Sequence, residues 1–281
     1  MLAVGLALVS AALFGAMTVG VRLGMGGDAG TAAVATIVPA VAVALVAVAV
    51  DAIGGGALAL SHAWPFALAG LLAPGGSQLL FTLGIREAGP SRTSVVVGTA
   101  PLVAVAIALV ALGEPLKAPL LAGAVLVVVG GVALASERGR PEHVRVFGLA
   151  FAAGATVLFA TRDNLVRWLA RGETTRPAVA AAATLLFGTL VVAAYARALP
   201  SAREFRALAP AGLCFGLSYV CLFEAYYRGR VSVVSPLVAT ESLWGVALSA
   251  VLFRAHEAIG RRLVFGAGLI VAGGALIGAF R

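Results

Sequence analysis

The stretch GAVLVVVGGVAL at residues 123–134 returns with few changes as GAGLIVAGGALI at residues 266–277. Both stretches are apolar, and both carry a Gly-Gly pair at the same place. The offset of 143 positions, from 123 to 266, is about half of the 281-residue chain. Self-similarity at one long offset indicates an internal duplication.

Further matches keep the same order in both halves of the chain, at offsets between 141 and 145. The matched pairs are Phe14 with Phe159, Arg22 with Arg167, Ser91 with Ser232, Ser94 with Ser235, Thr99 with Thr240, Leu102 with Leu243, and Glu114 with Glu257. We therefore divide the chain into a first repeat at residues 1–136, a connecting loop at 137–145 and a second repeat at 146–281.

The composition is that of a membrane protein. Hydrophobic residues make up 61% of the chain and charged residues 11%, with a mean hydropathy of +1.05, whereas a soluble domain has about 25% charged residues. A helix needs about 20 apolar residues to cross the bilayer. Ten stretches meet this length: residues 2–23, 31–50, 64–85, 91–112, 119–136, 146–169, 177–197, 208–228, 231–253 and 263–280. We therefore predict an all-α membrane protein with ten transmembrane helices.

Each predicted repeat contains five of these spans. Because five is an odd number, the second repeat must enter the membrane from the opposite side. The expected fold is thus two inverted five-helix repeats, an arrangement that creates a site near the bilayer midplane and is typical of alternating-access transporters.

The positive charge of the chain fits a membrane protein as well. A net charge of +8 suggests nucleic acid in a soluble protein, but here Lys and Arg lie mainly at the ends of apolar runs, where they reach lipid headgroups. We therefore expect membrane lipid and a small-molecule substrate as partners, no nucleic acid, and a monomer or a homodimer. The expected location is the cell membrane, as a multi-pass protein of a bacterial or archaeal inner membrane.

A five-helix repeat that ends in a helix, a Gly-Glu pair and a helix with a Gly-Gly pair, present twice, resembles the EamA-type transporters of the drug/metabolite transporter superfamily. In the first copy these residues are Gly113, Glu114 and the pair Gly130-Gly131. In the second copy they are Glu257 and the pair Gly273-Gly274, and His256 stands where the pattern has the Gly before Glu. The resemblance implies secondary transport, commonly export, of small metabolites such as amino acids, drugs or nucleotide-like compounds. It also implies cytoplasmic termini, whereas the distribution of Lys and Arg among the loops favours termini outside.

Charged side chains inside transmembrane spans are costly and indicate function. The four in this chain are Arg162, Asp163, Glu224 and Glu241, which we expect to pair with a substrate ammonium or carboxylate or to take up a proton. The structural alternative is an ion pair between Arg162 and Glu224, with an i,i+4 pair between Asp163 and Arg167. Glu241 has no evident basic partner at its depth, which favours a function for it.

Polar and aromatic side chains complete the predicted substrate site. They are Gln78, Thr82, Ser218, Tyr219, Phe223 and Trp244. Aromatic rings beside carboxylates suit an organic cation or an amino acid. Tyr226 and Tyr227 adjoin Arg228, and for these two an interfacial aromatic belt is the favoured interpretation.

Two prolines and two glutamates have structural interpretations. Pro101 and Pro236 interrupt the fourth and ninth spans, where each removes a backbone hydrogen bond; such breaks line transport cavities or are simple packing kinks. Glu114 and Glu257 directly precede the fifth and tenth spans, and we expect them to cap those helices, because a carboxylate is favoured at a helix N-terminus.

The sequence as a whole predicts a secondary active transporter, an exporter of a small metabolite or drug such as an amino acid or organic cation. It would work by alternating access, with the proton as a candidate coupling ion. The alternatives are a channel or non-transporting membrane scaffold, although no filter loop or charge ring is legible, and an intramembrane enzyme. Because no H-E-x-x-H motif or nucleophile elbow is present, we expect no enzyme activity, no catalytic residue, no metal site and no cofactor.

Overall fold

The structure is a computed structural model that describes residues 1–24, 29–55, 60–88, 96–115, 117–135, 146–172, 175–196, 198–252 and 261–280. Within these ranges all regular structure is helical. In chain order the elements are α1 Leu2–Gly24, α2 Ala29–Ile53, η1 Leu60–His62, α3 Trp64–Gly70, η2 Leu71–Gly76, α4 Ser77–Ala88, α6 Ala100–Ala111, α7 Ala118–Ala135, α8 Val146–Ala170, α9 Pro177–Tyr195, α10 Ala202–Arg228, α11 Val231–Val238, α12 Glu241–Leu252 and α13 Arg261–Phe280.

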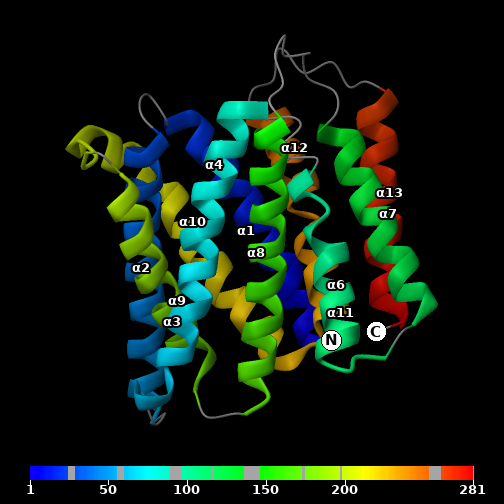
Figure 1. The fold of residues 1–281 in the computed structure, drawn as a ribbon, viewed down its shortest axis with the longest axis horizontal. Helices are drawn as coiled ribbons and strands as arrows, with labels where there is room; N and C mark the ends of the chain where they lie inside the picture. The colour runs from blue at the N-terminus through cyan, green and yellow to red at the C-terminus, as the bar shows by residue number, and fades with distance from the viewer. Residues whose placement is uncertain are drawn as a thin grey trace.

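The long helices stand side by side as one bundle, with α2 at one edge and the pair α7 and α13 at the other (Figure 1). α1 begins and α13 ends toward the same end of the bundle (Figure 1). α8 lies in the middle, where it packs against α4, α6 and α10. The chain therefore surrounds α8 with segments from both of its halves.

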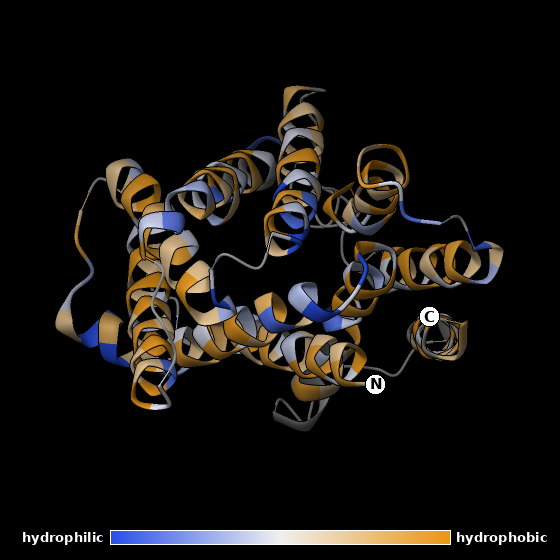
Figure 2. Ribbon diagram, turned by 90° about the horizontal axis from the view of Figure 1, so that it is seen from below, coloured by the Kyte–Doolittle hydropathy of each residue, from blue (hydrophilic) through white to orange (hydrophobic). Residues whose placement is uncertain are grey.

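Several helices have the length and apolar composition that a membrane span requires. Among the described residues, four helices are on their own both long enough and apolar enough to span a membrane: Leu2–Val21, Gly30–Ile53, Pro177–Tyr195 and Ala202–Arg228. Ala100–Ala111, Ala118–Ala133 and Phe265–Ile277 are apolar but shorter. Apolar residues dominate the helices, and hydrophilic residues gather near helix ends and around the middle of the bundle (Figure 2). Throughout the described residues the regular structure is helical, and its apolar helices agree with the membrane protein that the composition predicts.

The third predicted span is not one continuous helix. α3 ends at Gly70, the wide turn η2 follows with Ala73 in an extended conformation (φ −148°, ψ 125°), and α4 resumes at Ser77. Pro74 within η2 has no backbone N–H to donate. The Pro-Gly-Gly run at residues 74–76 is the sequence signal for this break, and the prediction of a single helix at 64–85 overlooked it.

The fourth and ninth predicted spans are also interrupted, but at threonines and not at the prolines. Thr99 precedes α6, and its hydroxyl donates to the carbonyl of Val96 at 2.6 Å. Thr240 separates α11 from α12, and its hydroxyl donates to the carbonyl of Leu237 at 2.7 Å. Pro101 lies in the first turn of α6, where a helix tolerates proline. At both breaks, a threonine hydroxyl thus donates to the carbonyl of the residue three positions earlier.

Close packing of glycines joins α7 to α13. A Cβ at Gly123 would lie 2.8 Å from the carbonyl oxygen of Gly273, and a Cβ at Gly273 would lie 2.6 Å from that of Gly123. Further along, a Cβ at Gly130 would lie 2.6 Å from the carbonyl oxygen of Gly266. Because the higher number on α7 meets the lower number on α13, the two helices are antiparallel. Glycine at these positions lets their backbones touch.

Polar side chains along α8 tie it to its neighbours. Asn164 Nδ2 donates to a carbonyl of α6 at 3.0 Å, and Arg171 Nη1 donates to the carbonyl that follows α6 at 2.9 Å. Arg167 Nη1 donates to two carbonyls at the C-terminal end of α10, at 2.8 and 3.1 Å. The predicted pair of Asp163 with Arg167 does not form, because the unfilled carbonyls at the end of α10 take the guanidinium. These contacts hold α8 in place around its charged residues.

Candidate functional site

Arg162 and Asp163 form a buried charged pair in the C-terminal half of α8. Their exposed fractions are 6% and 8%, and Arg162 Nε lies 2.9 Å from Asp163 Oδ1. The Nε–H bond of Arg162 is not directed at Asp163 Oδ1, so the two groups form an ion pair but no hydrogen bond. As a result, Arg162 Nε, Arg162 Nη1 and Asp163 Oδ1 have no hydrogen-bond partner among the described residues. Buried polar atoms without a hydrogen-bond partner are uncommon in folded proteins.

Side chains from α10 and α11 surround this pair. The guanidinium carbon of Arg162 lies 5.2 Å from the centre of the Tyr219 ring, a cation–π contact. Ser235 Oγ donates to Asp163 Oδ2 at 3.3 Å. The hydroxyl of Tyr226, wholly buried, lies close to Asp163 without the geometry of a hydrogen bond. We call Arg162, Asp163, Tyr219, Tyr226 and Ser235, together with Glu241, the α8 cluster.

Glu241 joins the α8 cluster from the start of α12. Its carboxyl is partly buried and within electrostatic reach of Asp163 and Arg162. α1 packs closely behind it, since a Cβ at Gly15 would lie 2.9 Å from the Glu241 carbonyl oxygen and 2.8 Å from Trp244 Cβ. Among the described residues no ion pair joins Glu241 to Arg162, so the prediction that Glu241 has no direct basic partner stays a prediction.

Glu224 does not belong to the α8 cluster, and the predicted ion pair with Arg162 is wrong. Glu224 instead forms an i,i+4 ion pair with Arg228 on the same helix. Five helical residues separate Glu224 from Tyr219, which turns its side chain by about 140° around α10. Seven residues separate Tyr226 from Tyr219, so these two share a face. Rotation about the axis of α10 therefore decides which of its residues faces Arg162.

Aromatic rings form a continuous column along α10. Tyr219 lies edge-on to Phe215 with ring centres 4.9 Å apart, and stacks on Phe223 at 5.8 Å. Phe66 of α3 lies 6.4 Å from Phe223 and stacks at the same distance on Tyr227. The prediction of an interfacial belt for Tyr226 and Tyr227 is wrong, because Tyr226 is fully buried and Tyr227 packs on Phe66 inside the bundle.

The other predicted site residues lie elsewhere. Ser218 is buried between α10 and α1, where its hydroxyl donates to the carbonyl of Ser10 at 2.9 Å and the Ser10 hydroxyl returns the same bond at 2.9 Å. Trp244 is 40% exposed on α12. The side chain of Thr82 is outside the described residues.

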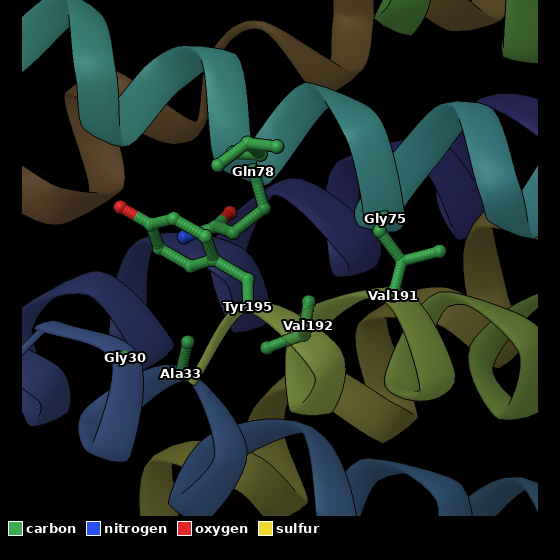
Figure 3. Close-up of a pocket in the computed structure, with 8 residues that line it drawn as sticks. Gly30, Ala33, Gly75, Gln78, Val191, Val192 and Tyr195 are labelled. Atoms are coloured by element: carbon green, nitrogen blue, oxygen red, sulfur yellow. The ribbon is translucent and has the colours of Figure 1, made fainter. Parts of the chain in front are cut away.

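Gln78 lines a separate hollow (Figure 3). This hollow lies between the first turns of α2, the region around the start of α4 and the last turns of α9, and its lining consists of Gly30, Ala33, Gly75, Gln78, Leu79, Val191, Val192 and Tyr195. The hollow has room for about one water molecule, so it does not enclose a drug-sized ligand. The lining of this hollow contains Gln78 but no residue of the α8 cluster.

Three residues of this region were not identified as site residues from the sequence. Ser235 and Tyr226 contact or approach Asp163, and neither residue type signals a site by itself. Ser235 did stand in the repeat, opposite Ser94. The third, Glu114, was expected to cap the helix that follows it, α7. Its carboxylate instead accepts the N–H groups of Val231 and Ser232 at 2.9 and 3.0 Å, so it caps α11 in the other half of the chain. Its counterpart Glu257 lies outside the described residues.

A helical membrane bundle with a buried, incompletely bonded charged site fits the class of membrane transport proteins. The sequence pattern of the EamA-like transporter family matches the chain twice, over residues 1–136 and 146–279. The chain belongs to the EamA-like transporter family, in keeping with the resemblance to the drug/metabolite transporter superfamily. It is therefore a multi-pass membrane protein and a transporter of small substrates, in a family that is generally not enzymatic.

A solved structure has the same fold as this chain. This structure, titled "Crystal structure of protein", has a TM-score of 0.82 with this chain at 20% sequence identity, covering 98% of this chain and 95% of its own. The sequence matches no curated protein at a significant level.

Proposed function

We propose that this protein is a secondary active transporter that exports a small metabolite or drug carrying an ammonium group, such as an amino acid or organic cation, by alternating access. The observation that carries this proposal is the α8 cluster, where Arg162 and Asp163 are buried yet leave Arg162 Nε, Nη1 and Asp163 Oδ1 without hydrogen bonds to described residues. A fully satisfied ion pair would serve packing alone. Unfilled donors and acceptors of both signs favour a ligand that brings its own polar groups.

The charges of the α8 cluster favour a cationic partner. Arg162 contributes one positive charge, and Asp163 and Glu241 each contribute a negative charge when ionised. A cluster with this surplus of negative charge is costly inside a membrane. Either a substrate ammonium or a proton restores neutrality. Exchange of one for the other supplies a mechanism for proton-coupled export, with Glu241 as the residue that exchanges them.

The glycine contacts of α7 and α13 support the inverted repeat on which alternating access would depend. At the offset of 143, Gly123 corresponds to Gly266 and Gly130 to Gly273. Exchange of the two repeats therefore turns the contact of Gly123 with Gly273 into the contact of Gly130 with Gly266. A two-fold axis in the membrane plane has this effect on an antiparallel helix pair.

The proposed ten spans follow from this repeat, once interrupted helices are counted as single crossings. They are α1, α2, α3 with α4, residues 91–112 including α6, α7, α8, α9, α10, α11 with α12, and α13.

Three probes with the same phenyl group separate the possible substrate classes. L-Phenylalanine carries an ammonium and a carboxylate, phenethylamine only the ammonium, and 3-phenylpropionate only the carboxylate. We expect the first two to raise the unfolding temperature of the purified protein, and 3-phenylpropionate to leave it unchanged. Asp163→Asn and Glu241→Gln should abolish the response, while Glu224→Gln, on another face of α10, should keep it. Equal stabilisation by 3-phenylpropionate, or no response to any probe, would contradict the proposed substrate class.

The direction of transport is tested in inside-out vesicles of the cell membrane. An exporter coupled to protons should accumulate labelled phenethylamine or phenylalanine when the vesicle lumen is acidic, because protons leaving the lumen drive the substrate in. A protonophore should abolish the accumulation, and Glu241→Gln should remove its dependence on the gradient. Accumulation that ignores the protonophore would exclude proton coupling.

A further inference from the structure

Glu114 belongs to the connection between α6 and α7, yet its carboxylate holds the start of α11. Gly113, with φ of +62°, turns the chain directly before it. Glu114 is 5% exposed. Its Oε1 accepts the N–H of Val231 at 2.9 Å, and its Oε2 accepts both the N–H of Ser232 at 3.0 Å and the Ser232 hydroxyl at 2.6 Å. A residue of the first repeat thus satisfies the first two backbone donors of a helix in the second.

α11 has no side-chain cap of its own besides this anchor. The helix has eight residues, which is too short to be stable without tertiary contacts. Arg230, its N-cap residue, makes no side-chain cap bond, and its carbonyl accepts only the next two N–H groups, from Val233 and Val234. A buried carboxylate at a helix N-terminus is also favoured by the helix dipole. Glu114 therefore holds the N-terminal end of α11, in addition to the packing of α11 against α1, α6 and α7.

α11 in turn carries or precedes two members of the α8 cluster. Ser235 lies one turn after Ser232 on the same helical face and donates to Asp163 Oδ2 at 3.3 Å. At the far end, the hydroxyl and the N–H of Thr240 both bond the carbonyl of Leu237, at 2.7 and 3.1 Å, and Glu241 follows at once. Because this turn is bonded and not loose, a shift of α11 moves both Ser235 and Glu241 relative to Asp163.

We infer that Glu114 is a positioning residue for the α8 cluster. It touches none of the cluster's charged groups, but it holds the N-terminal end of the helix that delivers Ser235 and Glu241. Because Glu114 lies in the first repeat and α11 in the second, the geometry of the cluster depends on how the two halves of the chain sit together. The inference of a role in substrate binding rests on the proposed function, whereas the positional role stands on the structure alone.

The chain contains a second helix cap that serves as a control, at the start of α10, where Glu204 Oε1 also accepts a bond from the Thr31 hydroxyl of α2 at 3.4 Å. At the start of α10, Ser201 and Glu204 form a capping box, in which the Glu204 N–H bonds Ser201 Oγ at 3.2 Å and the Ser201 N–H bonds Glu204 Oε2 at 2.9 Å. These two residues are not part of the α8 cluster. Glu204→Gln and Ser201→Ala therefore remove the same kinds of contact as Glu114→Gln and Ser232→Ala, at a different helix start.

The positional role is tested by amide hydrogen exchange on the full chain, with no ligand added. Glu114→Gln should speed exchange at least threefold both within α11 and at residues 239–245, beyond the break. Glu204→Gln should speed exchange in the first turn of α10 and near Thr31, its partner on α2, and should leave exchange at residues 239–245 unchanged. A change confined to residues 231–234 would overturn the inference, because it would make Glu114 a local cap.

The effect on binding is tested with L-phenylalanine and phenethylamine as probes. Glu114→Gln should weaken the affinity of whichever probe binds at least tenfold, while Ser201→Ala and Glu204→Gln change it less than twofold. The loss should shrink in a Ser235→Ala background, because Glu114 acts partly through Ser235. Unchanged affinity in Glu114→Gln overturns the role in binding.

If Glu114→Gln does not fold, Ser232→Ala is the alternative variant, because it removes one of the three bonds. It should show smaller changes in the same direction, and their absence overturns the inference. If no probe binds the wild type, the proposed function fails, and the exchange experiment still decides the positional role.

Discussion

Arg162 illustrates how a charge is kept inside the bundle. Its guanidinium lies between the carboxylate of Asp163, 2.9 Å from Nε, and the ring of Tyr219, 5.2 Å from the guanidinium carbon. These two contacts compensate the charge without filling its hydrogen-bonding capacity. A side chain in this condition is held in place and still able to bind another group. That combination is what a substrate site needs and a purely structural ion pair does not.

A double-mutant cycle measures how strongly Arg162 and Asp163 are coupled. Arg162→Gln leaves Asp163 and Glu241 without the nearby cation, and loss of one partner of a buried pair costs about 3–5 kcal/mol of unfolding free energy. Adding Asp163→Asn should recover part of this loss. The control cycle of Arg162→Gln with Glu224→Gln should be additive within about 0.5 kcal/mol, because Glu224 pairs with Arg228. Additivity in both cycles, measured by reversible unfolding in detergent, would mean that the Asp163 contact contributes nothing to stability.

At this scale the sequence singles out the charged residues of the α8 cluster but not their partners. Arg162, Asp163 and Glu241 stand out because charged residues are rare in apolar spans. The pairing of Arg162 with Asp163 instead of Glu224 depends on which face of α10 points toward α8. That face is set by contacts such as Ser10 with Ser218, two residues that are 208 positions apart in the chain. No local pattern around Glu224 contains this information.

At the scale of helices, Ser218 tests the difference between a binding residue and a packing residue. Ser10 and Ser218 exchange hydroxyl-to-carbonyl bonds across α1 and α10, both at 2.9 Å. We expect Ser10→Ala and Ser218→Ala each to lower the unfolding free energy by about 0.5–1.5 kcal/mol, with no change in the affinity for phenylalanine or phenethylamine. A tenfold loss of affinity in Ser218→Ala at unchanged stability would return Ser218 to the substrate site.

The interrupted helices show how far local sequence predicts elements in this chain. Length and hydropathy locate the apolar runs, but proline position alone does not locate a break. Pro236 lies inside α11 and Pro101 in the first turn of α6, whereas the breaks occur at Thr240 and Thr99. A threonine hydroxyl that bonds the carbonyl three residues earlier competes with helix continuation. The shared Thr at an offset of 141 was visible in the repeat, although its role was not.

At the scale of the whole molecule, the repeat and the composition carry most of the prediction. The apolar composition indicated a helical membrane protein, and the duplicated Gly-Gly segment pointed to the family. What the sequence could not supply is the connection between the halves, such as Glu114 at the start of α11. A carboxylate before a helix is ordinarily assigned to that helix. Only the three-dimensional approach of α11 to the loop after α6 reveals the actual partner.

The glycine contacts between α7 and α13 provide a test of the proposed two-fold relation. Alanine at Gly123 or Gly273 places a Cβ 2.8 or 2.6 Å from a carbonyl oxygen of the facing helix, so each change should cost about 1–3 kcal/mol of unfolding free energy through overpacking. Gly130→Ala should cost a similar amount, because the repeat makes its contact with Gly266 equivalent to that of Gly123 with Gly273.

Gly268 is the control for these variants, since a Cβ there meets nothing within 4 Å. Gly268→Ala should be neutral or stabilising by up to about 1 kcal/mol, the helix propensity difference between Gly and Ala.

The double variant Gly123→Ala with Gly273→Ala should lose less stability than the sum of the two single variants, since the same separation of α7 from α13 relieves both. Reversible unfolding in detergent measures all five variants. A stability loss at Gly268 equal to that at Gly123 would show that the cost comes from the helix and not from the contact. A loss at Gly273 with none at Gly130, its counterpart in the other repeat, would contradict the equivalence of the two contacts and weaken the inverted repeat that the proposed transport cycle requires.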